Sequence, residues 1–327
     1  MAALLEATGL TKHYDVQARG FFRRVGTALR AVDGVHLTIE PGETLGLVGE
    51  SGCGKSTLGR LLIRLIPATA GRVMFNGQEI TNLGPKPLRA VRRAMQIVFQ
   101  DPFGALNPRM SIEDTIIEPL LIHGSRRDAA ARDAVTQMLD KVGLPDSARF
   151  RFPHEFSGGQ RQRIGIARAL ILRPKLVVCD EPVSALDVSV QAQIVNLLSD
   201  LQVELGLTYL FIAHDLAVVK HISTRVAVMY LGKVVEIADK RSLYARPLHP
   251  YTQALLASVP VMHPSRRRRG PSGEPRITGD IPTALAPPSG CRFHTRCPHA
   301  MPVCRTEEPA LRVADAAHQA ACHLLAK

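Results

Sequence analysis

The residues from Gly49 to Ser56 read Gly-Glu-Ser-Gly-Cys-Gly-Lys-Ser, which is the composition of a loop that binds phosphate. Glycines leave backbone N–H groups free to surround a phosphate, and the start of the following helix adds its positive end. Lys55 would reach the β- and γ-phosphates of a nucleotide, and the Ser56 hydroxyl would ligate Mg²⁺. A chance glycine-rich turn is the alternative, but the predicted position between a strand and a helix argues against it. The apolar face of that helix is predicted to consist of Leu58, Leu61, Leu62 and Leu65. The expected nucleotide contacts are Gly49, Ser51, Gly52, Cys53, Gly54, Lys55, Ser56 and Thr57.

A pair of carboxylates, Asp180 and Glu181, follows the apolar run 176–179. Carboxylates at the carboxyl end of a parallel strand face a phosphate loop at the same sheet edge, so Asp180 is predicted to hold Mg²⁺, directly or through water. Glu181 is then placed to polarise a water for attack on the γ-phosphate. An isolated Asp-Glu pair would more simply end a strand, and the phosphate loop is what favours the catalytic interpretation.

A second anion-binding helix start is predicted at Ser157, Gly158, Gly159 and Gln160. Small residues that open a helix leave its first N–H groups free. Ser157 alone would be interpreted as a plain helix cap. With Gly-Gly-Gln attached, the stretch predicts a second phosphate-binding helix end in one chain.

Four of the six cysteines lie in the last 37 residues. Disulfides are disfavoured in the cytoplasm, and the alternative to a metal site is a set of free thiols that only pack. The spacing lacks both a close zinc pair and a ferredoxin run, so it does not identify the ion. The candidate metal ligands are Cys291, Cys297, Cys304 and Cys322, and zinc could also take His294, His299, His318 or His323.

The elements that must position these residues follow an α/β pattern. Up to about residue 250, apolar runs alternate with helix-period segments, which predicts a mainly parallel sheet covered by helices. The continuously apolar runs 44–48, 176–179 and 208–213 are predicted as central strands, buried on both faces. A helix from Val190 to Leu205, ended by Gly206, should cross over the sheet, and a hairpin is predicted over 225–237.

The chain is expected to have two parts. Residues 103–172 carry little strand pattern, which predicts an inserted helical subdomain within a nucleotide-binding domain of residues 1–250. After Pro247 the composition changes to Pro, Arg and Gly, with a run of arginines at 266–269. We therefore expect a linker and a small cysteine-bearing extension over residues 251–327.

Composition limits the partners. The 327 residues carry a net charge of +12, which would suit nucleic acid, an anionic membrane face or a nucleotide. Trp is absent and aromatic residues make up 5%, so base stacking is poorly supplied and nucleic acid is not expected. No run of about 18 apolar residues could span a bilayer. The start of the chain has an acidic residue at Glu6 and no basic leader, so the chain is expected to stay in the cytoplasm.

The phosphate loop, the carboxylate pair and the stretch Phe156–Arg163 together resemble the ATP-binding-cassette (ABC) ATPases over roughly residues 4–250. Phe156 stands where Leu is commoner. The resemblance implies a P-loop ATPase core, with a RecA-like, mostly parallel sheet, an antiparallel β subdomain and an inserted helical subdomain. In this family two cassettes bind head to tail, so that ATP on Lys55 of one chain is completed by Ser157 of the other.

The resemblance also implies roles for single residues. Gln100 would sense Mg²⁺ and the attacking water while contacting membrane subunits, and His214 would touch the γ-phosphate. Tyr14 would stack on adenine, and Asp187 lies in the Ser184–Asp187 loop that crosses the dimer interface. Taken alone, Tyr14 and His214 would be interpreted as packing residues.

Three stretches are similar to the ATPase subunits of oligopeptide/dipeptide importers, a group that includes nickel and glutathione importers: Gln100–Met110, Leu248–Thr252 and Gly290–Pro298. The first is more like the second (F-type) of the two ATPases that such importers employ, which implies a heterodimer with a paralogous ATPase. Further implied partners are two transmembrane permeases and an extracytoplasmic peptide-binding protein. The implied location is peripheral, on the cytoplasmic face of the inner membrane, and the implied tail group is a 4Fe-4S cluster on all four cysteines.

The predicted function is ATP hydrolysis that powers import of di- or oligopeptides through dimer closure. The same role in a nickel or glutathione importer is an alternative, as is a soluble cassette that acts on nucleic acid. A nucleotide kinase or GTPase would also use Lys55 and Ser56, but would not explain Ser157–Gln160. For the tail we expect a structural or redox-sensing role.

Overall fold

The computed structural model describes residues 2–17, 26–258, 279–315 and 317–326, so the arginine run at 266–269 lies outside the described residues. Its strands are β1 (Leu5–Gln17), β2 (Gly26–Ile39), β3 (Thr44–Val48), β4 (Ala70–Phe75), β5 (Gln78–Glu79), β6 (Met95–Val98), β7 (Leu176–Asp180), β8 (Thr208–Ile212), β9 (Arg225–Tyr230), β10 (Lys233–Asp239), β11 (Arg312–Asp315) and β12 (His318–Ala320). Its α-helices are α1 (Lys55–Leu62), α2 (Pro85–Arg93), α3 (Pro102–Ala105), α4 (Ile112–Ile122), α5 (Ala129–Lys141), α6 (Gly158–Leu170), α7 (Val188–Leu205), α8 (Leu216–Ile222), α9 (Lys240–Ala245), α10 (Pro250–Ala257) and α11 (Val303–Thr306). Short 3-10 helices cover Asp146–Phe150, Pro153–Glu155 and His323–Ala326.

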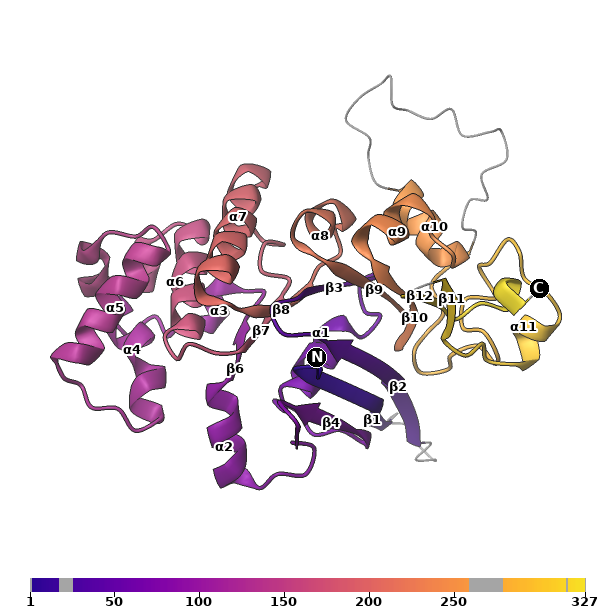
Figure 1. Cartoon of the computed structure of the whole chain (residues 1–327), viewed down its shortest axis with the longest axis horizontal. Coiled ribbons are helices and arrows are strands. Elements are labelled where there is room, and N and C mark those ends of the chain that lie inside the picture. The colour runs from indigo at the N-terminus through magenta and orange to yellow at the C-terminus, as the bar shows by residue number, and fades with distance from the viewer. Residues whose placement is uncertain (1, 18–25, 259–278, 316, 327) are drawn as a thin grey trace, which may run out of the picture.

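The main sheet has the order β11-β12-β10-β9-β3-β8-β7-β6 and lies at the centre of the molecule (Figure 1). Its strands from β9 to β6 are parallel, as predicted. Every residue of β3, β7 and β8 is buried, because helices cover both faces. The crossing helix α7 ends at Gly206, which adopts the left-handed conformation, and β9 and β10 form the expected hairpin.

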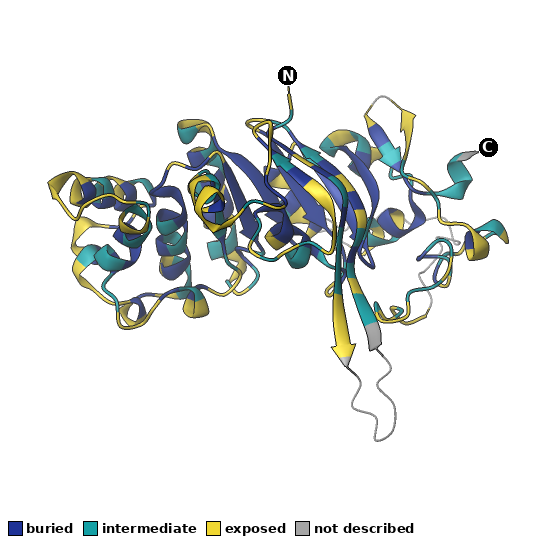
Figure 2. Ribbon diagram, turned by 90° about the horizontal axis from the view of Figure 1, so that it is seen from below, coloured by how far each residue is buried: buried dark blue, intermediate teal, exposed yellow. Residues whose placement is uncertain are grey.

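A second, antiparallel sheet has the order β2-β1-β4-β5. The strands at the centre of the molecule are mostly buried (Figure 2). A hydrophobic core between the two sheets encloses α1, whose Leu58, Leu61 and Leu62 are fully buried. The predicted apolar face of this helix also included Leu65, and that prediction was wrong: α1 ends at Leu62 and Leu65 is 41% exposed. The chain turns away at Arg64, which has a positive φ of 56°.

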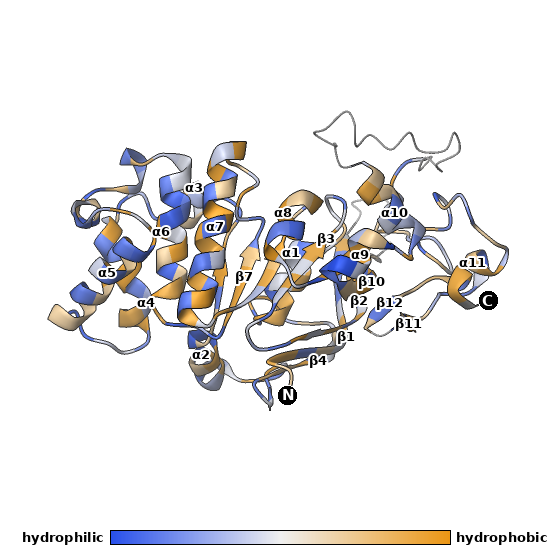
Figure 3. Ribbon diagram, turned by 45° about the horizontal axis from the view of Figure 1, so that its top comes forward, coloured by the Kyte–Doolittle hydropathy of each residue, from blue (hydrophilic) through white to orange (hydrophobic). Residues whose placement is uncertain are grey.

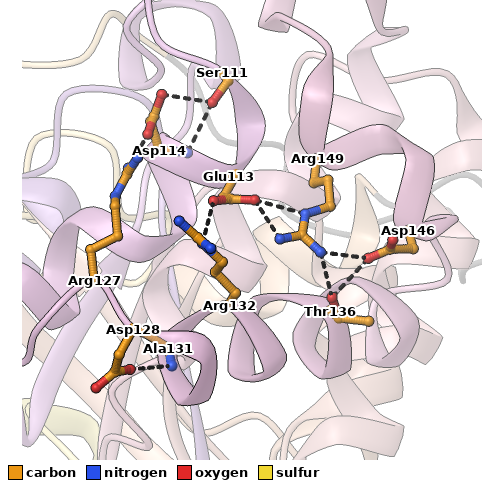
Figure 4. Close-up of polar contacts among 10 residues, drawn as sticks. All are labelled: Ser111, Glu113, Asp114, Arg127, Asp128, Ala131, Arg132, Thr136, Asp146 and Arg149. Atoms are coloured by element: carbon orange, nitrogen blue, oxygen red, sulfur yellow. Dashed lines mark hydrogen bonds and ion pairs between the residues drawn. The ribbon is translucent and has the colours of Figure 1, made fainter.

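Residues 103–172 are all described and contain helices α3 to α6 with two 3-10 turns, and no strand. Arg149 lies in the 3-10 helix Asp146–Phe150 and joins it to two α-helices. Its guanidinium donates to Glu113 of α4 at 2.7 Å and to Thr136 of α5 at 3.2 Å (Figure 4). Ser111 and Asp128 cap α4 and α5. Helix α6 packs beside α7, which joins this helical region to the sheet (Figure 3).

The cysteine-bearing tail is joined to the main sheet. Strand β12 pairs antiparallel with β10, through Glu236 opposite Ala320, and β11 pairs with β12. The tail therefore extends the main sheet by two strands, since an edge strand offers unpaired N–H and C=O groups to any strand that reaches it. Among the described helices, none has the length and apolar character needed to cross a membrane.

Candidate nucleotide-binding site

The phosphate loop joins the buried end of β3 to the start of α1. Two of its glycines have no room for a side chain: a Cβ on Gly49 would lie 2.2 Å from the Met229 carbonyl oxygen, and one on Gly54 2.1 Å from that of Ala31. Gly54 also has a φ of 107°, which favours glycine. The loop is therefore held tightly against β9 and β2, and the start of α1 faces the loop, where a phosphate would bind.

Two polar contacts at the loop match the predicted chemistry. Lys55 is 4% exposed, and its ammonium donates to the carbonyl oxygens of Gly49 at 2.8 Å and Glu50 at 3.0 Å. The Ser56 hydroxyl donates to Asp180 Oδ1 at 2.7 Å across the edge of the sheet. Asp180 Oδ2 is buried with no hydrogen-bond partner, and the Arg60 guanidinium lies 3.5 Å from it. A hydroxyl and a buried carboxylate with a spare oxygen suit a hard cation such as Mg²⁺.

Glu181 lies at the centre of a polar group from three strand ends. It follows β7 with a positive φ of 48°, and its N–H donates to the Ile212 carbonyl oxygen at 3.0 Å. Its Oε2 accepts from the Gln100 amide at 3.1 Å and lies 3.3 Å from His214 Nδ1. These three residues line an open cleft of about 530 Å³ together with Ser51, Asp101, Ser184 and Ala185. One cleft thus joins the predicted catalytic residues to the phosphate loop.

The second predicted anion site is the start of α6. Ser157 caps the helix and forms a capping box: its N–H donates to Gln160 Oε1 at 3.0 Å, and Gln160 N–H donates to its hydroxyl at 3.3 Å. Ser157 and Gln160 are exposed, and Gly159 lies against α7, where a Cβ would be 2.5 Å from a Val190 methyl group. None of these residues lines the cleft around Glu181 in the described part of the chain.

Three other predicted contacts are distributed around the loop. Thr57 is half-buried in α1, and Asp187 is exposed at the start of α7. Tyr14 lies on β1 with its ring 38% exposed and 4.9 Å from the Lys12 ammonium.

Burial raises the pKa of the Cys53 thiol against the opposing effect of Lys55, so this loop cysteine stays a neutral thiol at pH 7.

The four tail cysteines lie near one another. Burial, reinforced by the charges of Cys304, Cys322 and Cys297, raises the pKa of Cys291 to about 11. Cysteine sulfur is the ligand type that zinc and iron–sulfur clusters prefer, but the described residues contain no set of three or more His, Cys, Asp or Glu side chains arranged to hold an ion. Of the histidines predicted as zinc ligands, His318 bonds the buried Glu236 at 2.7 Å instead.

Sequence reasoning missed the residues that attach the tail to the phosphate loop. The Glu50 carboxylate accepts two bonds from the Arg296 guanidinium, at 2.8 and 3.0 Å, and the Glu50 N–H donates to the Tyr251 hydroxyl at 2.9 Å. Both partners belong to stretches that carried the importer resemblance, which was the one signal available. Their contact with the loop could not be predicted, because 246 positions separate Arg296 from Glu50.

Comparison with known proteins agrees with this geometry. Residues 32–184 match the ABC transporter family, and residues 235–304 match the oligopeptide/dipeptide transporter C-terminal region. The chain is 53% identical to the oligopeptide transport ATP-binding protein AppF of Bacillus subtilis (strain 168), covering 98% of this chain and 97% of that one. It is 52% identical to the probable peptide ABC transporter ATP-binding protein y4tS of Sinorhizobium fredii, covering 99% of this chain and 90% of that one.

Solved structures show the same fold. The dimeric ATP-binding cassette MJ0796 bound to ADP and Pi has a TM-score of 0.64 at 28% identity, covering 72% of this chain and 99% of that one. The cbiO1 subunit of the cbiONQ transporter complex of Clostridium perfringens has a TM-score of 0.65 at 27% identity, covering 75% and 92%. With its phosphate loop, its Asp180-Glu181 pair and a C-terminal region of the oligopeptide/dipeptide type, the chain belongs to the ATP-binding proteins of the ABC transporter family and is an ATPase.

Proposed function

We propose that this chain powers the import of di- or oligopeptides through a membrane transporter by hydrolysing ATP. The observation that carries the proposal is Glu181, which lies beside the phosphate loop and contacts both Gln100 and His214. Relatives at 50–53% identity over nearly the whole chain are named as peptide or oligopeptide transport proteins, which supports the substrate class.

The roles of the residues follow from where they lie. The phosphate loop would bind the β- and γ-phosphates through its N–H groups and Lys55, which would exchange the carbonyls of Gly49 and Glu50 for phosphate oxygens. Ser56 and Asp180 would hold Mg²⁺, which neutralises charge on the phosphates when bound. Glu181 would take a proton from the attacking water, with Gln100 orienting its carboxylate and His214 placed beside the γ-phosphate. Tyr14 would stack on adenine.

We also propose that two cassettes close head to tail, and that the second is a paralogous ATPase. Ser157 to Gln160 are exposed or half-buried at the start of α6, where they could face the ATP of a partner, with Asp187 in the adjoining loop. MJ0796, which shares the fold, is described as dimeric with ADP and Pi. In this proposal the closed pair drives two permeases on the cytoplasmic face of the inner membrane, with an extracytoplasmic peptide-binding protein acting through them.

The proposed boundary near residue 250 separates the cassette from the extension in sequence only. The match to the oligopeptide/dipeptide C-terminal region spans residues 235–304 and therefore crosses it. For the extension we propose that Cys291, Cys297, Cys304 and Cys322 bind a 4Fe-4S cluster, with Zn²⁺ as the alternative. The support is that the charges of neighbouring tail cysteines help to raise the pKa of Cys291 and of Cys322, which indicates that these thiols lie close together.

The cluster proposal has a direct test. Protein purified without oxygen should be brown, with broad absorbance near ~400 nm, and Cys297→Ser should lose this absorbance. Ser is chosen because it preserves the size of the side chain while removing the sulfur ligand. A colourless anaerobic sample that contains one zinc per chain would exclude the iron–sulfur cluster and keep the four cysteines as ligands.

The transport proposal is tested by purifying the chain together with two permeases, a second cassette and a peptide-binding protein, and reconstituting them in vesicles. Peptide-loaded binding protein should stimulate ATP hydrolysis, and mass spectrometry should find peptide inside the vesicles. Stimulation by a nickel complex or by glutathione alone would favour those substrates instead. Salt-sensitive binding of the isolated chain to DNA would favour the nucleic-acid alternative.

A further inference from the structure

The segment between two tail cysteines, Cys291 to Cys297, lies directly against the phosphate loop. Arg296 binds the Glu50 carboxylate with both terminal nitrogens, a geometry that fixes direction as well as distance. The Arg296 side chain is 8% exposed and the Glu50 side chain 21%, so water screens this ion pair only weakly. Residues 291–297 form the tail segment.

Glu50 is fixed through its backbone as well as its side chain. Its N–H donates to Tyr251 Oη, and its carbonyl oxygen accepts from the Lys55 ammonium at 3.0 Å and from the Cys53 N–H at 3.3 Å. The contacts with the tail therefore restrain the same residue whose carbonyl oxygen contacts Lys55. A single residue, Glu50, thus connects the tail to Lys55, the lysine proposed to bind phosphate.

A second arginine of the tail segment supports the other side of the loop. Arg292 binds the Asp33 carboxylate and the Leu231 carbonyl oxygen in the β9–β10 turn. The next residue of that turn, Gly232, donates its N–H to the Cys53 carbonyl oxygen at 2.8 Å. The two arginines, each next to a cysteine, thus reach the phosphate loop at Glu50 and at Cys53.

Phe293 anchors the tail segment between these two contacts. Its ring is 1% exposed and packs edge-on to Tyr230, with ring centres 5.3 Å apart, and against Tyr251 at 5.4 Å. Tyr251 is the residue that bonds the Glu50 N–H. The aromatic packing makes the position of the tail segment and that of the loop mutually dependent, because close-packed rings leave little room for independent movement.

We propose that the tail segment positions the phosphate loop, with Arg296 as the positioning residue, so that docking of the tail and binding of ATP strengthen each other. The proposal rests on the phosphate loop being the ATP site. Arg296 acts through Glu50, not on the nucleotide itself. Because coupling between two sites is reciprocal, ATP should also stabilise the docked tail.

The first test measures ATP binding to the full-length chain. Arg296→Gln removes the charge that pairs with Glu50 and should weaken ATP affinity by about 10-fold or more, since it leaves a carboxylate without its partner. Arg296→Lys, which keeps one charged contact, should recover part of the loss. The control is Arg305→Gln, an exposed arginine of the same tail in α11, which should bind ATP as the wild type does.

A double-mutant cycle separates positioning from a general loss of stability. Glu50→Gln should weaken ATP binding as Arg296→Gln does, and the double variant should be no worse than either single one. Glu50→Gln leaves the tail sequence intact, so it carries the test even where Arg296→Gln does not fold. Additive losses in the cycle would overturn the proposal, as would wild-type affinity in both single variants.

The reciprocal effect is measured by amide hydrogen exchange. ATP should slow exchange in residues 291–305 by about 3-fold or more in the wild type, and this protection should disappear in Arg296→Gln at saturating ATP. Equal protection in both proteins would overturn the proposal. Failure of the wild type to bind ATP at all would refute the proposed function instead, and Lys55→Ala supplies the reference for that outcome.

Discussion

At the scale of single residues, the site is organised around one carboxylate. Glu181 contacts both Gln100 and His214, and its backbone has a left-handed conformation that residues at strand ends rarely adopt. Such strain at a functional residue is retained where the surrounding contacts fix it, here through the Glu181 N–H bond to Ile212. Its carboxylate is therefore aimed before any nucleotide arrives.

Glu181→Gln should keep ATP binding and lower turnover by about 100-fold or more, because an amide cannot take the proton from water while Lys55, Ser56 and Asp180 stay in place. ATP should then trap a closed dimer, visible by size-exclusion chromatography. The matched control is Glu204→Gln, an exposed carboxylate on α7, which should hydrolyse at close to the normal rate. Normal turnover in Glu181→Gln would contradict the assignment of this residue.

At the scale of elements, the junction between the cassette and the tail is built on buried polar groups. The Glu236 side chain, fully buried in β10, accepts from the N–H groups of Leu248 and His249 and contacts His318 of β12. His249 in turn accepts from the Tyr251 N–H through Nδ1 and caps α10. Three elements therefore meet at one carboxylate, which explains why the stretch 248–252 lies where the tail docks.

Burial lowers the pKa of His249 to about 4 from its ordinary 6.5, so the folded protein binds fewer protons than the unfolded chain between these values. Stability should therefore fall as the pH drops from about 6.5 to about 4, by up to ~1.4 kcal/mol per unit from this residue. In His249→Asn, which keeps a capping acceptor without a titrating group, this part of the pH dependence should vanish from urea unfolding. The same slope in both proteins would show that other groups cause it.

At the scale of the whole molecule, one chain contains two helix starts that suit phosphate, and they lie on different parts of the fold. Helix α1 starts between the two sheets, whereas α6 starts in the helical region, with its capping serine exposed. This separation agrees with a proposal in which each ATP is completed by a second cassette.

Ser157→Arg should therefore impair hydrolysis at the partner's phosphate loop while ATP binding to Lys55 of the same chain survives, because a bulky cation replaces a small residue at the exposed helix start. The measurement uses complexes that carry the change on one subunit only. Ser125→Arg, in an exposed loop of the same helical region, is the control for added charge. Loss of ATP binding in the chain that carries Ser157→Arg would contradict the assignment.

Much of the cassette was predictable because its signals are local. The run from Thr44 to Ser56 contains a strand, a loop and a helix start whose residue types determine their own conformations, and Gly206 ends α7 because it accepts a positive φ. The strands 176–180 and 208–212 were equally clear, since burial on both faces requires continuous apolar residues. The end of α1 was not predictable in this way. The sequence pattern placed Leu65 on its apolar face, but the helix ends at Leu62 before a turn at Arg64 that no local pattern indicates.

The sequence by itself predicted which residues carry the chemistry, whereas only the tertiary structure decided which of them meet. Ser56 and Asp180 are 124 positions apart, and they meet because parallel strands bring their carboxyl ends to one edge. No such rule predicts the contact of Arg296 with Glu50 or the pairing of β12 with the edge of β10. Those contacts depend on how the distant tail folds back on the sheet, and neither the composition of the tail nor its spacing predicts where it packs.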